Sequence, residues 1–244
     1  MIITLLYCML IFAVIGGIGM AIGTRHQPLA VKKQRWLKFA VYLLVITVVL
    51  VSILYKFFFP VALLIVILCS IEFYRACLKV TDGKRGGMLP ALAIYILIIT
   101  GFLFFAIKST MSTRLFAYTG VIIFDAFSQI AGQIFGRTAL IPSVSPAKTW
   151  EGFWGGVIFC VITSLGIVSI LQQPLLYGVA GGILTALFAF AGDVLASLFK
   201  RKAGIKDYSN WLPGQGGFLD RFDSFLFAGA AYYLLKIIFV SSIL

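Results

Sequence analysis

Acidic side chains are scarce in this chain, and half of them lie close together near its end. Of eight aspartates and glutamates, four fall between positions 193 and 223. On a helix, Asp193, Ser197 and Arg201 share one face because they are spaced i, i+4 and i+8. Such a stripe can hold a metal ion at its carboxylate and a phosphate at its guanidinium. A basic pair snorkelling at a helix end would explain Lys200 and Arg201, but not Asp193, about two turns deeper.

A glycine-rich turn follows in the same region. Three glycines occur within four residues: Gly214, Gly216 and Gly217. Backbone N–H groups can approach a ligand closely at glycine, and a helix N-terminus favours phosphate. Asp220 and Asp223, spaced i, i+3, then lie on one face of the next helix. Two carboxylates beside phosphate suit Mg²⁺, although either one alone could complement the helix dipole. We therefore predict that Asp193, Asp220 and Asp223 bind metal.

A second polar stretch lies upstream, in an expected loop between two apolar runs. Ser145, Lys148 and Thr149 offer donors to phosphate oxygens. Thr149 could instead cap the helix that follows, and the residues alone leave both roles open. The stretch is not a Walker A loop, because the GxxxxGK[ST] spacing is missing.

The elements that must position these residues are membrane helices. The chain has 244 residues, of which 61% are hydrophobic and only 11% charged, too few charges to coat a water-facing surface. The apolar residues fall in long runs, and runs of about 18 or more apolar residues indicate bilayer-spanning helices. We predict an all-α integral membrane protein with one polytopic domain over 1–244, its N-terminal helices in 1–114 and its chemistry in 115–244. The expected spans are 2–22, 39–55, 57–74, 88–107, 115–135, 153–171, 176–199 and 224–243.

The basic residues indicate the orientation of these spans. The net charge is +12, and most lysines and arginines fall in the loop 25–38, in the loop after the third span, and in the loops that hold the polar stretches. Positive loops stay in the cytoplasm, so both termini should face away from it. In a chain this apolar, the charge indicates anionic headgroups and an anionic substrate rather than nucleic acid.

The cysteines, two further acidic residues and several glycines have structural rather than chemical explanations. The four cysteines lack the spacing of a zinc site or a disulfide framework. Glu72 and Asp82, which flank a basic loop, are interpreted as charge balance. Glycines in or beside the sixth and seventh spans indicate close helix packing: Gly152, Gly155, Gly156, Gly178, Gly181 and Gly182.

The stretch from Ser197 to Asp223 resembles the signature of the phosphatidate cytidylyltransferase family. The matching positions, at the family's spacing, are Ser197, Lys200-Arg201, Lys206-Asp207, Pro213, Gly216-Gly217, Asp220-Arg221 and Asp223. The stretch Ser145-Pro146-x-Lys148-Thr149-x-Glu151-Gly152 matches a further family motif. Before about position 125, only hydrophobicity is shared.

The resemblance implies transfer of CMP from CTP to phosphatidate, giving CDP-diacylglycerol and pyrophosphate. It implies Mg²⁺ or another divalent cation, with a second metal ion left open, and an active site at the cytoplasmic ends of the C-terminal helices in a bacterial inner membrane or its equivalent. The implied partners are CTP, phosphatidate or another lipid phosphate, and the bilayer; a homodimer is left open. The implied catalytic residues are Asp193, Lys206, Asp207, Asp220 and Asp223. The implied substrate-binding residues are Ser145, Lys148, Thr149, Ser197, Lys200, Arg201, Gln215, Gly216, Gly217 and Arg221.

Two positions depart from the family pattern. Gln215 stands where the pattern has histidine, and Gln129 stands where it usually has aspartate. Glutamine can donate to phosphate but cannot act as a base. Asp125, one helical turn earlier, is a candidate to replace the missing carboxylate in space.

Four alternative functions follow from the same residues. A specialised paralogue would transfer CMP to another lipid phosphate, and the two glutamines motivate it. A CTP-dependent lipid kinase would release CDP instead of pyrophosphate. A non-catalytic homologue is disfavoured by the nearly complete set of acidic and basic residues. A transporter is disfavoured because its ionisable residues would lie near the bilayer midplane.

Overall fold

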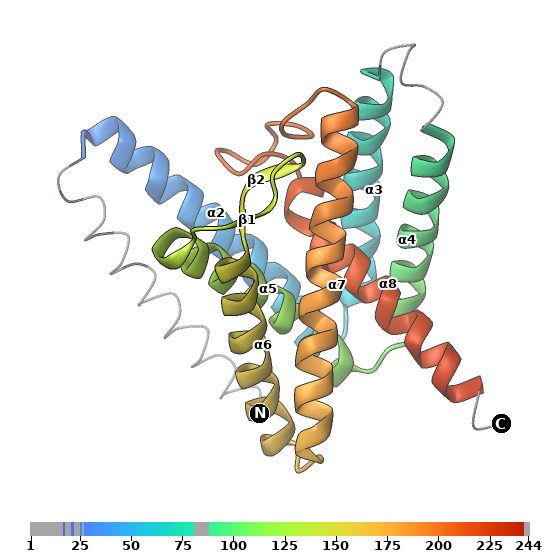
Figure 1. The fold of residues 1–244 in the computed structure, drawn as a ribbon. Coiled ribbons are helices and arrows are strands. Elements are labelled where there is room, and N and C mark those ends of the chain that lie inside the picture. Colours follow the sequence, from blue (N-terminus) through green and yellow to red (C-terminus); the bar gives the residue numbers. More distant parts are fainter. Residues whose placement is uncertain (1–16, 18–20, 22–24, 26, 81–87, 242–244) are drawn as a thin grey trace.

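The computed structural model describes residues 17, 21, 25, 27–80 and 88–241 (Figure 1). The helices with printed bounds are α2 (Leu29–Leu54), α3 (Phe58–Leu78), α4 (Met88–Lys108), α5 (Met111–Phe135), α6 (Trp150–Ile170), α7 (Leu175–Lys202) and α8 (Leu219–Ser241). Between α5 and α6, β1 (Ala139–Ile141) and β2 (Ser145–Thr149) form a two-stranded antiparallel sheet.

Within the part of the chain that the structure describes, six helices, α2 to α7, are long and apolar enough to cross a membrane. This confirms the prediction of an all-α integral membrane protein, and the chain is a multi-pass one. The predicted span 2–22 lies outside the described residues except for Gly17 and Ala21. The predicted span 224–243 corresponds to α8, which begins earlier, at Leu219, and is not among these six helices.

The prediction of a loop over 25–38 was wrong from Leu29 onward, where α2 begins. Lys32, Lys33, Arg35 and Lys38 therefore lie on the first turns of a helix. The apolar run begins only at residue 39, but lysine, arginine and glutamine are themselves good helix formers and extend the helix outward. The connection between α2 and α3 is tight, with only residues 55–57 between the helices and Lys56 at a φ of 62°.

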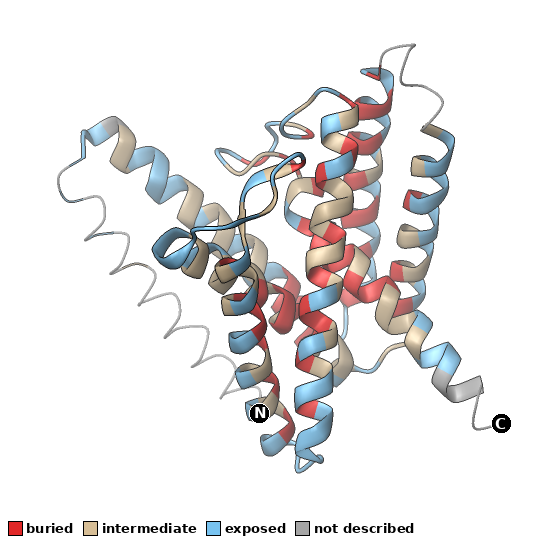
Figure 2. Ribbon diagram, in the orientation of Figure 1, coloured by how far each residue is buried: buried red, intermediate tan, exposed pale blue. Residues whose placement is uncertain are grey.

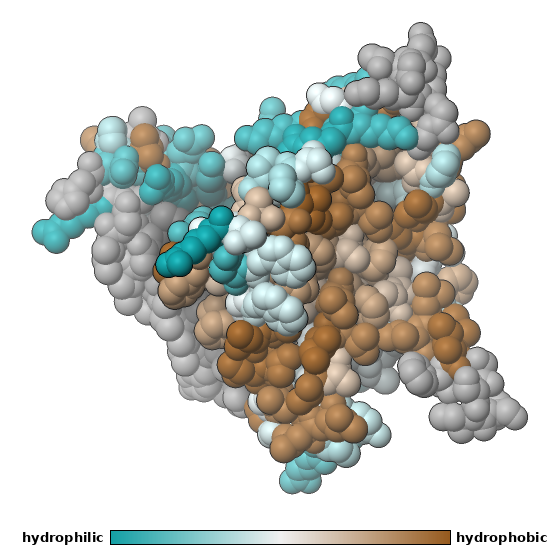
Figure 3. All heavy atoms as spheres, viewed as in Figure 1, coloured by the Kyte–Doolittle hydropathy of each residue, from teal (hydrophilic) through white to brown (hydrophobic). Residues whose placement is uncertain are grey.

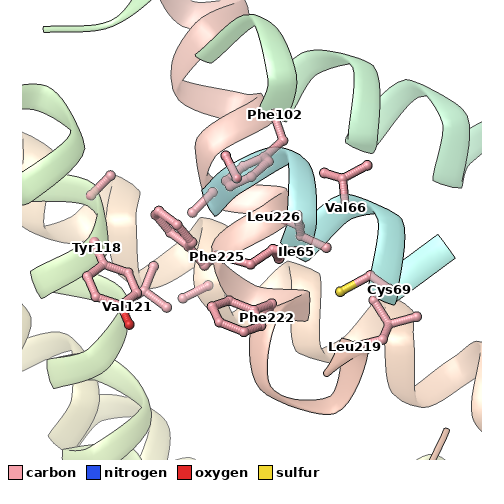
Figure 4. Close-up of a cluster of buried hydrophobic side chains, with 14 of the residues drawn as sticks. Ile65, Val66, Cys69, Phe102, Tyr118, Val121, Leu219, Phe222, Phe225 and Leu226 are labelled. Carbon is pink, nitrogen blue, oxygen red and sulfur yellow. The ribbon is translucent and has the colours of Figure 1, made fainter. Parts of the chain in front are cut away.

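Helix α8 crosses the bundle and packs on α3, α4, α5 and α7. Phe225 is fully buried at this crossing, with its ring between those of Phe58, Phe102 and Tyr118. Figure 4 shows the same cluster, with Leu226 and Phe222 beside Phe225 on α8. Figure 2 shows the buried residues concentrated at this crossing. The first turn of α8, which carries acidic residues, is therefore anchored by the core.

Glycines allow α5, α6 and α7 to pack closely, as predicted. A Cβ added at Gly155 would lie 2.4 Å from Ala131 Cβ, and one at Gly182 would lie 2.7 Å from Val161 Cα. Any larger side chain would force these helices apart. The approach brings the ends of α5, α6 and α7 together at the hairpin.

The outer faces of the helices expose large apolar side chains. Leu97 is 62% exposed, Ile134 66% and Leu176 72%. Figure 3 shows such residues covering the lower and right parts of the molecule, whereas hydrophilic residues gather along its upper edge. An apolar surface of this extent suits lipid rather than water. The start of α2, the β1–β2 hairpin and the loop before α8 all lie toward the hydrophilic side (Figure 1).

Candidate active site

The polar centre lies between α7 and the β1–β2 hairpin. Lys148 of β2 forms an ion pair with Asp193 of α7. Ser197, one turn further along α7, donates its hydroxyl hydrogen to Asp193 Oδ1 at 3.3 Å, as the i, i+4 spacing predicts. Lys148 Nζ also lies 5.3 Å from the centre of the Phe190 ring. It is buried and finds no hydrogen bond beyond this ion pair among the described residues, so its remaining donors suit an anionic ligand.

Three carboxylates on three helices interact near this centre. Asp125 of α5, Asp193 of α7 and Asp223 of α8 interact electrostatically with one another, and Lys148 offsets part of this repulsion at Asp125. Like charges gathered in an apolar domain are costly and usually functional. Asp125 lies among these carboxylates, whereas Gln129, one helical turn later on α5, is exposed.

Asp220 has a different environment from Asp223, although both lie in the first turns of α8. Its Oδ1 accepts a hydrogen bond from Lys200 Nζ at 2.7 Å, and its Oδ2 accepts from the backbone N–H groups of Tyr208 and Gly217 at 2.8 and 2.9 Å. The Asp220 side chain is only 4% exposed. Its oxygens therefore already hold the glycine-rich turn and the end of α7 together.

The structure does not assemble the predicted metal triad. Within the described residues, no three Asp, Glu, His or Cys side chains converge to hold a metal ion, and Asp220 is occupied by protein donors. Asp193 and Asp223, on adjacent helices, remain. Two carboxylates fit Mg²⁺, which typically binds through one or two carboxylates, with substrate phosphates and water completing its shell.

Glu72 is a buried residue that positions the start of α8, a role that its sequence context does not indicate. Its interpretation as charge balance was wrong, because its side chain in α3 is fully buried. Its oxygens accept hydrogen bonds from the Ser209 hydroxyl at 2.5 Å and from the N–H groups of Phe218 and Leu219 at 3.1 and 2.7 Å. A carboxylate at a helix N-terminus also complements the helix dipole. Glu72 therefore fixes the start of α8, and hence Asp223, to α3.

Gln215 turns toward α2. Its side-chain Nε2 donates to the backbone carbonyl oxygen of Lys38 at 2.7 Å, and the backbone carbonyl oxygen of Gln215 accepts from Arg221 Nε at 2.8 Å. Gly214 and Gly216, at φ of 70° and 85°, permit this turn. The glycine-rich turn thus packs on α2, with Gly214 against the Lys38 side chain.

The β1–β2 hairpin is held to both of its neighbouring helices. Thr149 accepts a hydrogen bond from Gly152 N at 3.1 Å, so its alternative role as the cap of α6 is confirmed. Arg201 Nε donates to the Val144 carbonyl oxygen at 2.9 Å, which ties the hairpin to the end of α7. Ser145 pairs with Ile141 at the start of β2.

The loop between α7 and α8 carries the remaining predicted residues. Lys206 and Asp207 are exposed, and the structure brings neither into direct contact with Asp193. Tyr208 is buried beside them, and this burial raises the pKa of its phenol. Its hydroxyl donates to the Ala196 carbonyl oxygen at 3.3 Å, and Lys200 Nζ lies 5.5 Å from the centre of its ring.

Several proteins similar to this chain carry the name phosphatidate cytidylyltransferase. Phosphatidate cytidylyltransferase 5, chloroplastic, of Arabidopsis thaliana is 41% identical over 121 residues, which are 49% of this chain and 30% of that protein. The phosphatidate cytidylyltransferases of Aquifex aeolicus and Bacillus subtilis are 40% and 38% identical, over 55% and 50% of this chain and 52% and 47% of their own lengths. The chain thus spans between about a third and a half of these relatives.

The sequence pattern of the cytidylyltransferase family matches residues 1–239, almost the whole chain. The match therefore includes α3 with Glu72, the hairpin with Lys148, and the carboxylates of α5, α7 and α8. The chain belongs to the cytidylyltransferase family.

Proposed function

We propose that this protein transfers CMP from CTP to phosphatidate, forming CDP-diacylglycerol and releasing pyrophosphate. The observation that carries the proposal is the buried Lys148 ammonium beside Asp193, with Asp223 facing the same centre from α8. The family and the names of its relatives support the choice of nucleotide and acceptor.

The chemistry needs positioning more than covalent participation. An oxygen of the lipid phosphate attacks the α-phosphorus of CTP, one P–O bond forms, and the bond to the β-phosphate bridge breaks, so pyrophosphate leaves with its electron pair. A phosphate monoester is already largely ionised near neutral pH, because its second pKa is about 6, so a strong protein base is not required. Charge neutralisation and alignment supply most of the acceleration.

Basic residues around the centre would bind the phosphates. Lys148 supplies buried donors, and Arg201 donates to the hairpin. Lys206, in the loop between α7 and α8, and Arg221, at the start of α8, are exposed. Lys200 is committed to Asp220 at 2.7 Å, so its part is to hold the scaffold. Gln215, bonded to Lys38, supports the loop rather than the reaction.

A divalent cation, Mg²⁺ by its donor chemistry, would be held by Asp193 and Asp223 together with substrate phosphate oxygens. When bound, it would neutralise charge that develops on the phosphates. We further propose that this end of the bundle faces the cytoplasm, because the basic loops gather there.

The test is CTP turnover by purified protein in detergent with phosphatidate and Mg²⁺. We expect CDP-diacylglycerol and pyrophosphate in equal amounts, and loss of both with EDTA. Release of CDP with no CDP-lipid would instead indicate a kinase. A panel of other lipid phosphates tests the alternative acceptor, and a strong preference for one of them would replace phosphatidate in the proposal.

A matched pair of variants ties the activity to the centre. Lys148→Met should reduce kcat/KM by roughly 100-fold or more, because it removes a buried cation from the developing charge. Lys236→Met is the same substitution far from the centre, near the C-terminal end of α8. There Lys236 donates to the Lys108 carbonyl oxygen, so this variant should leave turnover unchanged. Equal activity in both variants would remove Lys148 from the site.

A further inference from the structure

The first turns of α2 carry a basic surface that the proposed reaction does not use. Its four cations are Lys32, Lys33, Arg35 and Lys38. Lys33 and Arg35 are exposed, and neither has a carboxylate partner among the described residues. Figure 1 shows this end of α2 extending away from the bundle, and Figure 3 shows hydrophilic residues gathered there. Two cations can therefore bind anions from outside the chain.

The apolar part of α2 sets the depth of these cations in a membrane. Residues 39–54, which form the rest of the helix, carry no charge. They span about 24 Å along the helix axis, whereas the hydrocarbon core of a bilayer is about 30 Å thick. The apolar part is thus too short to hold the basic turns out in water. They lie at the level of the lipid headgroups.

Exposed apolar side chains accompany the basic surface. Trp36 and Leu37 are exposed, and they share a side of the helix with Lys33 because they follow it by three and four residues. Leu44, also exposed, continues this side toward the middle of α2. Tryptophan is enriched where membrane meets water. Cations interleaved with apolar side chains that run on into a membrane span fit a lipid surface, not nucleic acid or an acidic soluble protein.

The other side of the same turns holds the glycine-rich turn. Lys38 lies about 140° around the helix from Lys33, and its backbone carbonyl oxygen accepts from Gln215 Nε2 at 2.7 Å. A Cβ at Gly214 would collide with the Lys38 side chain, so the two elements are in direct contact. The backbone carbonyl oxygen of Gln215 accepts in turn from Arg221 Nε at 2.8 Å. A continuous set of contacts thus joins the start of α2 to the first turn of α8.

We propose that the start of α2 binds anionic phospholipid headgroups and that this binding holds the glycine-rich turn in place. Lys33 and Arg35 bind the headgroups, while Lys38 and Gln215 pass the restraint to the turn. The lipid is a constituent of the surrounding membrane, not the acceptor that the reaction consumes. Faster CMP transfer as a consequence rests on the proposed function, whereas lipid binding and ordering of the turn do not.

The coupling follows from the geometry of one rigid helix. Headgroups that hold Lys33 and Arg35 limit the motion of this end of α2, so the Lys38 carbonyl oxygen stays within reach of Gln215. Because coupling between two binding events is reciprocal, a turn that is attached to α2 also favours the helix position that presents the cations to lipid. In a neutral bilayer this mutual support is lost.

The first experiment detects lipid contact without turnover. Wild-type protein in phosphatidylcholine vesicles receives a trace of phosphatidylglycerol that carries a diazirine on its headgroup. We expect illumination to label residues 29–38, and about 1 M salt, which screens charges beyond about 3 Å, to weaken the labelling. Phosphatidylcholine with the same group on its headgroup should label this segment far less. Equal labelling by the two lipids would mean proximity without charge recognition and would overturn the proposal.

A matched pair of double variants tests the charges. Lys33→Gln with Arg35→Gln removes both cations and should lower labelling by phosphatidylglycerol roughly tenfold or more, because each basic residue at an anionic surface adds to binding. Lys33→Arg with Arg35→Lys exchanges the residues but keeps both charges, and should be labelled as wild type is. Undiminished labelling of the neutral variant, or loss of labelling in the exchanged variant, contradicts the proposal.

Hydrogen exchange tests the link to the glycine-rich turn. In phosphatidylcholine nanodiscs, added phosphatidylglycerol should slow amide exchange of residues 209–217 about fivefold in wild type and should have no effect in the neutral variant. Gln215→Ala removes the bond to Lys38. It should keep the labelling of α2 but lose the slowing. Slowing that persists in Gln215→Ala would show that the restraint does not pass through this bond.

Turnover tests the consequence for the reaction. At saturating CTP and a fixed surface fraction of phosphatidate, replacing phosphatidylcholine by phosphatidylglycerol should raise kcat about fivefold in wild type but not in the neutral variant. Lys56→Gln with Lys108→Gln removes two exposed cations after α2 and at the end of α4, and should respond as wild type does. An equal rise in the neutral variant would refute activation through α2. If wild type transfers no CMP while labelling and exchange still respond to phosphatidylglycerol, the proposed function fails and the lipid surface stands.

Discussion

Asp220 and Asp223 have the same residue type and neighbouring positions on α8 but opposite surroundings. Asp220 accepts hydrogen bonds from a lysine and two backbone N–H groups. Asp223, among the described residues, accepts the N–H of Ser224 and interacts electrostatically with two other aspartates as well as with Lys200. Their i, i+3 spacing correctly predicts that they lie near one another. It carries no information about the loop donors that satisfy one of them, because those donors come from residues whose positions depend on the fold.

Replacing each of these aspartates by asparagine should separate chemistry from scaffold. Asp223→Asn should abolish CMP transfer with little change in melting temperature. Asp220→Asn should lower stability by about 3 kcal/mol, because it leaves the buried Lys200 ammonium without its counter-charge. Thermal unfolding in detergent and the turnover assay measure the two effects. Equal melting temperatures for the two variants would contradict the scaffold role of Asp220.

Glu72 shows what local pattern cannot reveal. Beside a basic loop it has the sequence context of a surface charge. Yet it is buried against the Ser209 hydroxyl and the N–H groups of Phe218 and Leu219, which lie 137 to 147 positions away. The one available signal was its place near the end of a predicted membrane span, where a carboxylate is costly unless it has a partner. Gly217 is part of the same arrangement, since a Cβ there would lie 2.6 Å from the Glu72 oxygens.

Glu72→Gln should destabilise the start of α8. The amide NH₂ group would face backbone donors, and each unsatisfied buried group costs about 1–3 kcal/mol. Ser209→Ala, which removes one bond to the same carboxylate, should cost less, about 1 kcal/mol. We expect kcat to fall with Glu72→Gln while KM for CTP changes little. Melting temperatures in the reverse order would show that Glu72 does not hold α8.

At the scale of elements, the contact between α2 and the glycine-rich turn gives Gln215 its role. The Nε2 atom binds the Lys38 carbonyl oxygen, so position 215 joins two elements. The prediction from sequence put Lys38 in a loop rather than on a helix, so a contact between α2 and position 215 could not be predicted. A histidine at this position would have an N–H able to make the same bond.

Gln215→His should therefore change kcat/KM by no more than about fivefold, the value of one neutral hydrogen bond. Gln215→Ala, which removes the donor, should weaken the attachment of the turn and raise protease sensitivity of the loop before α8. Turnover and limited proteolysis measure these effects. A rise of a hundredfold with histidine would instead mean that position 215 reaches the reacting phosphates.

The hairpin and α6 form a second positioning unit, which depends on one cap. Thr149→Ala should cost about 1 kcal/mol through the lost bond to Gly152 N, and it should loosen Lys148, the preceding residue of β2. Thr149→Ser keeps the accepting oxygen and should behave as wild type in thermal unfolding. A serine variant as unstable as the alanine variant would show that the methyl group, and not the cap, matters.

At the scale of the whole molecule, hydropathy predicts which segments are membrane helices but not how they cross. Six long apolar helices follow from runs such as those of α3 and α4. The path of α8 through the core depends on which faces of the other helices pack around Phe225. The local pattern of apolar residues does not specify these faces.

The orientation of the molecule in the membrane can be measured directly. Asn210 lies in the loop before α8 and Gln173 in the turn between α6 and α7, and both are exposed. In a background without the four native cysteines, single Asn210→Cys and Gln173→Cys variants are treated with a membrane-impermeant thiol reagent. Because basic loops remain in the cytoplasm, intact cells should show labelling at position 173 only, and lysed cells at both. Labelling at 210 in intact cells would place the site away from the cytoplasm, where CTP is made, and would contradict the proposed reaction as well as the orientation.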